Sequence, residues 1–253
     1  NLGADPAFHD LIFYGHKPPE GWRTRKPASA DRPTKYDPLE KIVLPDRTLS
    51  TVPLPDHVER TRKNAVMIQA GSGHASGFFI SEQGHIMTNA HVVADAMRVR
   101  VTMADKKEAV TAEVLRRDYA RDVALLRLEE LPKEAPIVVL PVRTDWPGVG
   151  ETVYSIGAPL TNRMQDTVRR GIVSAHRKKF KLLGARQDLI QADVVTQGGN
   201  SGGPLLDEFG NIVALAHAGY AVAGIDLSLN MFVPIGQAFD VMDVSIAGRD
   251  ISS

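Results

Sequence analysis

Short β-like segments follow one another closely from Asn64 onward, and this pattern limits the fold more than any other feature of the chain. Residues 98–103 alternate strictly between polar and apolar side chains, as a strand with one buried face does. Residues 81–84 have the composition of a hairpin turn between two such segments. Many short strands separated by turns predict a sandwich or a barrel. Because a stretch containing Pro and Gly near 146–150 separates two sets of segments, we predict an all-β chain with two barrels.

The expected strands of the first set are 65–70, 77–81, 85–89, 98–103, 108–115 and 122–128. Those of the second set are 152–156, 167–174, 189–194, 204–206, 212–217 and 230–233. Ile235, Phe239 and Met242 recur at a helical spacing and predict a short C-terminal helix. We therefore divide the chain into an arm (1–63), a first β-barrel (64–148) and a second β-barrel with the terminal helix (149–253).

The arm is rich in proline, with nine of the sixteen prolines of the chain before Asn64. Prolines at this density prevent regular helices and interrupt strand ladders, so we expect an extended segment with at most a short helix near 5–14. Its large apolar side chains are unusual for a solvated tail; they are Phe8, Ile12, Phe13, Tyr14, Trp22 and Tyr36. We expect the barrels or a neighbouring subunit to receive them.

Composition excludes several classes of function. Thirty basic and thirty acidic residues cancel, which gives no electrostatic basis for binding nucleic acid. The absence of cysteine excludes disulfides, thiol catalysis and thiolate metal sites. No apolar run approaches the roughly 20 residues that span a bilayer, and the chain starts at Asn1 without a signal-peptide pattern. The histidines have no convincing metal spacing and no phosphate-binding loop is recognisable, so we expect neither metal nor cofactor.

One serine, Ser201, lies in a glycine-rich segment, 198–205, whose backbone can take unusual conformations. A serine hydroxyl becomes a good nucleophile only beside a base that a third group holds. Residues 88–93 offer His91, and residues 121–126 offer Asp122. Each residue alone has a plainer interpretation: an ordinary turn, a core histidine, or an aspartate paired with Arg121 at the surface. Together they indicate the Ser-His-Asp triad of a serine protease.

Residues 88–93, 122–126 and 199–205 resemble the three active-site motifs of the trypsin/chymotrypsin superfamily. The segments 76–81, 155–159 and 171–174 make the wider pattern similar to the bacterial HtrA (Deg-like) branch. The resemblance covers about residues 64–243 and implies two six-stranded antiparallel barrels. Members of this branch usually carry a C-terminal peptide-binding PDZ domain, and we expect none in a chain that ends at Ser253.

The resemblance also implies a role for each site residue. Ser201 would attack the scissile carbonyl, His91 would take and return the proton, and Asp122 would hold the imidazole. The N–H groups of Gly199 and Ser201 would form the oxyanion hole.

A substrate pocket follows from the same resemblance. Val195 would form its base and, lacking a charge, would favour apolar P1 residues. Thr196, His217 and Ala218 would complete its walls. His217 departs from the small polar residue typical of relatives. It would narrow the pocket, bond a substrate backbone, or serve as an ordinary core or surface histidine.

We therefore expect an endopeptidase for unfolded or partly folded polypeptides, periplasmic or secreted in a bacterium, and a homotrimer formed through the arm. One alternative is a regulatory or binding protein with a protease fold, held inactive by the arm or the oxyanion loop. An esterase with an α/β-hydrolase fold is disfavoured because its histidine comes last in sequence. The basic residues between 177 and 186 predict a solvated loop between two strands, or a sensor loop that contacts substrate or another subunit.

Overall fold

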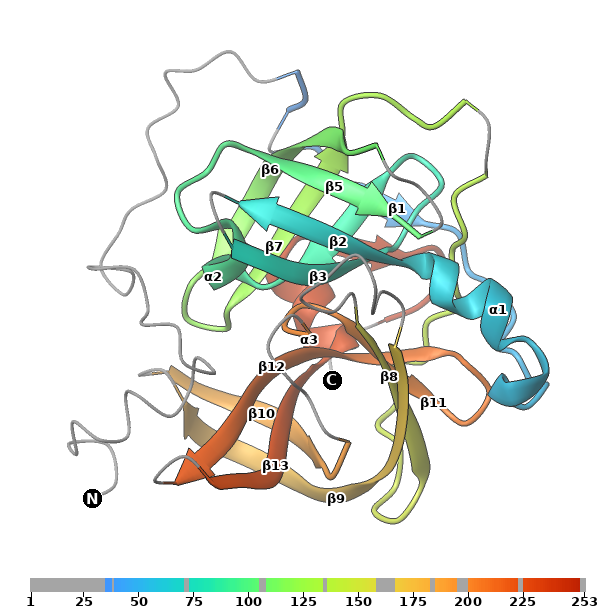
Figure 1. Cartoon of the computed structure of the whole chain (residues 1–253), viewed down its shortest axis with the longest axis vertical. Helices are drawn as coiled ribbons and strands as arrows, with labels where there is room; N and C mark the ends of the chain where they lie inside the picture. Colours follow the sequence, from blue (N-terminus) through green and yellow to red (C-terminus); the bar gives the residue numbers. More distant parts are fainter. Residues whose placement is uncertain are drawn as a thin grey trace.

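The computed structural model describes residues 35–37, 39–70, 73–104, 108–133, 136–157, 167–182, 185–194, 200–222 and 225–250. Its strands close into two six-stranded barrels, one above the other in Figure 1. This arrangement confirms the predicted fold class. Within the described residues, no helix is long and apolar enough to cross a membrane.

The first barrel has the strand order β2-β3-β4-β7-β6-β5, with antiparallel neighbours throughout. Its strands are β2 (Ala65–Ala70), β3 (Gly73–Phe79), β4 (His85–Thr88), β5 (Arg98–Met103), β6 (Val110–Asp118) and β7 (Val123–Leu128). Alternate side chains of β5 point inward, so that Val99 and Val101 are buried while Arg98 and Arg100 are exposed. The expected alternation of this strand is confirmed.

The second barrel has the order β10-β13-β12-β11-β8-β9, again antiparallel throughout. Its strands are β8 (Thr152–Gly157), β9 (Thr167–Leu182), β10 (Ala185–Ala192), β11 (Pro204–Asp207), β12 (Ile212–Val222) and β13 (Ile225–Pro234). All six are longer than the segments expected from the sequence, and β9, β12 and β13 differ most.

The stretch predicted as a basic loop is instead the continuation of a hairpin, because β9 runs to Leu182 and β10 starts at Ala185. Paired backbone groups hold these strands together where the sequence offers no alternation of polar and apolar residues. Asp188 adds side-chain contacts by accepting the Lys179 N–H at 2.6 Å and pairing with the Lys178 ammonium at 3.2 Å. Lys178 also lies over the ring of Trp146, 3.7 Å from its centroid.

Short elements surround the barrels. The helices are α1 (Val58–Thr61), α2 (Ala90–Val93) and α3 (Ile235–Val241), and single 3-10 turns cover Leu54–Asp56 and Arg62–Asn64. The last of the three helices lies where the sequence predicts one. Strand β1 (Ile42–Leu44) pairs in parallel with β14 (Val244–Ile246), which joins the arm to the C-terminal end of the chain.

The described part of the arm contacts both barrels: the Ser50 N–H donates to the Asn211 side chain of the second barrel at 2.8 Å, and Tyr36 lies on the first. The Tyr36 hydroxyl donates to the Leu128 carbonyl at 2.8 Å, and the Arg127 guanidinium lies 4.1 Å from the centre of its ring. The short helix expected near 5–14, and the side chains of Phe8 to Trp22, lie outside the described residues.

One buried apolar cluster spans both barrels and brings their facing sides together. Phe78 and Leu125 enter it from the first barrel, Leu189 and Leu215 from the second, and Phe239 from α3. Because this cluster fixes how the barrels meet, it also fixes the relative positions of groups carried by different barrels.

Candidate active site

His91 lies on α2, a single helical turn that follows directly from β4. The preceding residue, Asn89, has extended backbone angles and donates its side-chain N–H to the Asp122 carbonyl at 2.9 Å. This bond ties the start of α2 to the turn before β7. The His91 side chain keeps 18% of its surface exposed, so its ring remains accessible from solvent.

Asp122 has an unusual backbone with φ at 57°, a left-handed conformation that Asp tolerates better than most residues. Asp118 closes the turn before it by accepting the Arg121 N–H at 2.7 Å. Arg121 also pairs with Asp118, at 3.4 Å, so the surface ion pair considered from the sequence belongs to Asp118. Asp122 itself is directed inward, with only 2% of its side chain exposed.

The Asp122 carboxylate holds His91 in two places. One oxygen accepts the His91 backbone N–H at 2.8 Å, and the other lies 2.7 Å from the ring Nδ1. Since an ionised carboxylate can only accept hydrogen bonds, this contact places the proton on Nδ1. The other ring nitrogen, Nε2, is then the proton acceptor of the neutral imidazole.

Two opposing effects act on the pKa of Asp122. Burial raises it, but the charges and N–H donors of His91 and His217 outweigh burial and hold it well below its usual range. The carboxylate is therefore ionised at neutral pH.

His217 lies on β12 of the second barrel, and its side chain is completely buried. Its Nδ1 is 3.1 Å from the same Asp122 oxygen that contacts the His91 ring, and its Nε2 is 3.4 Å from the Gln187 side-chain nitrogen. The residue assigned to a pocket wall by resemblance thus contacts the Asp122 carboxylate. Ala218 follows on β12 and pairs with Met231.

The Ser201 segment is bonded to both barrels. The Ser201 carbonyl accepts the Ser76 N–H at 2.9 Å, and the N–H of Gly202 donates to the Ala216 carbonyl at 3.1 Å. Gly202 has φ at +83°, and a Cβ there would collide with the Ser76 carbonyl and the Thr88 hydroxyl. The segment therefore lies against the end of β4, which leads directly to His91. Val195, Thr196 and Gly199 lie outside the described residues.

Sequence reasoning assigned no role to Ser76, Thr88 and Asn89, although all three belong to the motifs it identified. They are buried, and the Thr88 hydroxyl donates to the Ser76 carbonyl at 2.7 Å. With the bonds from Ser76 to Ser201 and from Asn89 to Asp122, they connect the serine segment to the aspartate turn. The sequence signal for these residues was a polar side chain next to apolar strand residues, which indicates a buried group that needs a hydrogen-bond partner.

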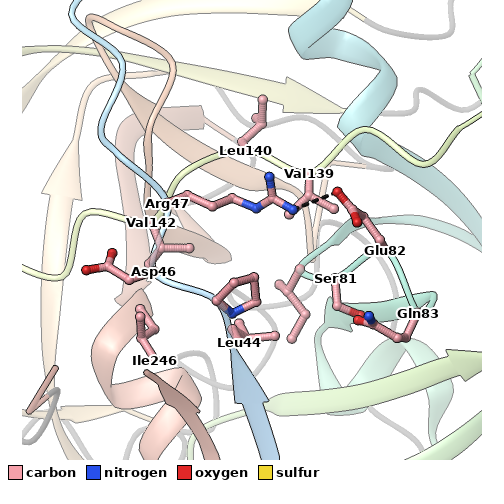
Figure 2. Close-up of a pocket in the computed structure, with 12 residues that line it drawn as sticks. Leu44, Asp46, Arg47, Ser81, Glu82, Gln83, Val139, Leu140, Val142 and Ile246 are labelled. Carbon is pink, nitrogen blue, oxygen red and sulfur yellow. Dashed lines mark hydrogen bonds and ion pairs between the residues drawn. The ribbon is translucent and has the colours of Figure 1, made fainter. Parts of the chain in front are cut away.

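A separate pocket lies away from these groups, between the strand β1, the turn after β3 and the strand β14 (Figure 2). It is lined by Leu44 and Ile246 among others and crossed by the ion pair of Arg47 with Glu82 at 2.8 Å. None of His91, Asp122 and Ser201 lines it. The described residues contain no cluster of three His, Asp or Glu side chains that could hold a metal ion.

Comparisons with known proteins agree with this geometry. Residues 75–215 match the family described as trypsin-like peptidase domain. The chain is 32% identical over 180 residues to Protease Do-like 1, chloroplastic, of Arabidopsis thaliana, which covers 70% of this chain and 40% of that protein. It is 37% identical over 177 residues to a probable periplasmic serine endoprotease DegP-like of Pseudomonas fulva (strain 12-X), covering 70% of this chain and 36% of that protein.

A solved structure described as HtrA-type protease AlgW with tripeptide aligns with a TM-score of 0.65 at 28% identity, covering 73% of this chain and 60% of that chain. The chain spans no more than 40% of the length of the two curated relatives.

Proposed function

This chain belongs to the trypsin-like peptidase family, with HtrA- and DegP-like proteases among its relatives, and on that premise we propose that it is a serine endopeptidase. The observation that carries the proposal is the contact of His91 with the buried Asp122 at 2.7 Å, beside which the Ser201 segment is bonded. A buried carboxylate that fixes one imidazole tautomer is the arrangement that a serine nucleophile needs for activation.

In the proposed reaction the Ser201 oxygen attacks the carbonyl carbon of the scissile peptide bond while His91 Nε2 takes its proton. The Asp122 carboxylate stabilises the resulting imidazolium without taking its proton. The N–H groups of Gly199 and Ser201 receive the developing oxyanion. The imidazolium then protonates the leaving amine as the peptide C–N bond breaks, which leaves an acyl group on Ser201. Water, deprotonated by the same imidazole, hydrolyses that ester and regenerates the hydroxyl.

The substrates we propose are unfolded or partly folded polypeptides with an apolar P1 residue, cleaved in the periplasm of a bacterium. The neutral Val195 at the expected pocket base supports the P1 preference, and the probable periplasmic DegP-like relatives support the compartment. The homotrimer through the arm stays a prediction from the resemblance.

A fluorophosphonate probe tests the chemistry directly, because it labels only an activated serine. We expect covalent labelling of the wild type and none of Ser201→Ala. Ser245→Ala is the matched control, because Ser245 lies on β14 and donates to the Ile42 carbonyl. It should label like the wild type. A folded wild-type sample without label would refute the proposal and favour an inactive protein with a protease fold. Cleavage of unfolded casein compared with a native protein then tests the substrate class.

A further inference from the structure

A second histidine shares the carboxylate of the proposed triad. His217 comes from the second barrel, whereas Asp122 comes from the first, and 95 residues of chain separate them. Both side chains are almost completely buried, with 0% and 2% of their surfaces exposed. Burying an imidazole costs free energy unless its polar atoms are bonded, so a histidine at this position must have polar partners. Its partner on one side is the carboxylate that holds His91.

The hydrogen-bond directions around His217 follow from the chemistry of its neighbours. The Asp122 oxygen only accepts, so His217 Nδ1 carries a proton and donates it at 3.1 Å. The Gln187 side-chain nitrogen only donates, so His217 Nε2, 3.4 Å away, is the acceptor. His217 thus supplies the buried Asp122 carboxylate with a second ring N–H donor.

On the basis of the proposed function, we propose that His217 is a positioning residue for the reaction. It fixes the Asp122 carboxylate from the opposite barrel, and through that carboxylate it fixes the His91 ring relative to Ser201. The same carboxylate oxygen receives the Nδ1–H groups of both rings, at 2.7 Å and 3.1 Å. Without the second donor this oxygen would be buried with a single bond, and the carboxylate would lose one of its anchors. His217 also links the orientation of the base to the docking of the barrel that carries the nucleophile.

The test compares His217→Ala with His217→Asn in the full chain. Alanine removes the donor, whereas an asparagine amide can place an N–H near the position of Nδ1. A lost hydrogen bond to a charged group corresponds to about a 10- to 100-fold loss, which we expect in kcat for His217→Ala with KM changed less than about threefold. We expect His217→Asn to recover to within about fivefold of wild type. Equal kcat in His217→Ala and wild type would overturn the proposal.

His176→Asn is the matched control. His176 is also a histidine of the second barrel, but it contacts the Pro147 carbonyl at 2.8 Å and the edge of Trp146. Its variant should keep wild-type kcat and KM. A loss in His176→Asn as large as in His217→Ala would show that removing any histidine from this barrel disturbs catalysis, and would count against a specific role.

A double-mutant cycle separates positioning from a general structural effect. If His217 acts through Asp122, then His217→Ala should change kcat less than about threefold in an Asp122→Asn background. Full additivity of the two losses would overturn the proposal.

Proton NMR gives a readout that does not need activity. Two ring N–H groups bonded to one buried carboxylate should both resonate far downfield; His217→Ala should remove one and shift the other. A wild type that cleaves nothing but shows both signals would refute the proposed function and retain the contact. A wild type lacking the His217 signal would refute the contact even if the enzyme is active.

Discussion

His85 is buried at the start of β4, with 5% of its surface exposed. Its Nδ1 lies 2.7 Å from the Ser81 hydroxyl, while its Nε2 has no hydrogen-bond partner within the described residues. Burial, with smaller contributions from the charges of Arg127 and Arg116, lowers the pKa of His85 to about 4. The folded protein therefore resists a proton that the unfolded chain accepts near pH 6.5.

This pKa difference predicts how stability depends on pH. Between pH 6.5 and about 4 the unfolded chain binds up to one more proton at His85 than the folded chain. The contribution of His85 to the free energy of unfolding therefore falls as pH falls, and it levels off below about pH 4. We expect wild type to lose about 2–3 kcal/mol more than His85→Asn across this window. Urea unfolding at several pH values measures the difference. Parallel curves for the two proteins would contradict it. The lowered pKa of Asp122 acts in a separate window, since its contribution is lost only below the ordinary carboxyl range.

Gly202 and Gly248 both have a positive φ, but only Gly202 lies close to other atoms. Comparing their alanine variants therefore distinguishes the cost of backbone strain from the cost of a steric clash. Gly202 has φ at +83° and Gly248 at +74°, but only at Gly202 would a Cβ meet other atoms, because nothing lies within 4 Å at Gly248. Both alanine variants should lose about 1–2 kcal/mol from the positive φ. Gly202→Ala should lose about 1–3 kcal/mol more and at least about tenfold in the rate of fluorophosphonate labelling, because Ser201 must shift. Similar labelling rates in both variants would show that the serine segment does not depend on this close approach.

The sequence predicts some strands better than others. Strands with a local apolar pattern are predicted well, whereas strands stabilised by residues far away in the sequence are not. Strand β5 alternates over six residues and its limits were predicted correctly. Strand β1 has only three residues, and its partner β14 lies about 200 residues later, so no local pattern indicates the pairing. The far ends of β9 and β10 stabilise each other through backbone bonds and polar side chains, which leave no apolar periodicity.

The candidate site was also predicted only in part, because some of its contacts depend on residues far apart in the sequence. The three motifs identified His91, Asp122 and Ser201, and the structure joins the first two at 2.7 Å. The position of His217 beside Asp122 could not be predicted, because it depends on how one barrel docks on the other. From the sequence, His217 is only a departure from the residue typical of relatives, and its role as a pocket residue or an ordinary core or surface histidine stayed open.

Strand β1 also offers a test of what the arm contributes. Leu44 is buried in the large apolar cluster with 4% exposed, whereas its neighbour Val43 points outward with 57% exposed. We expect Leu44→Ala to lower the free energy of unfolding by about 2–4 kcal/mol and Val43→Ala to change it by less than about 0.5 kcal/mol. Denaturant unfolding measures both. Equal effects would mean that the pairing of β1 with β14 adds no packing to the core.

The two barrels share a large buried apolar cluster, which predicts that they unfold together. The large cluster contains residues of both barrels and of α3, while a second cluster, which includes Phe79 and Leu126, belongs to the first barrel alone. The proposed base and carboxylate lie on the first barrel and the nucleophile on the second. A catalytic site divided in this way functions only while the barrels remain docked, so its activity depends on the shared cluster.

Phe79→Ala tests this coupling, because Phe79 packs only within the first barrel's own cluster. We expect the variant to lose about 3–5 kcal/mol, and native-state hydrogen exchange should show equal loss of protection in β7 and in β12. Equal loss follows because the amides of both barrels then exchange through one global opening. If β12 kept its wild-type protection while β7 lost it, the barrels would be independent units. The docking that holds His217 against Asp122 would then open without unfolding of the second barrel, and the site would lose its alignment at temperatures where that barrel is still folded.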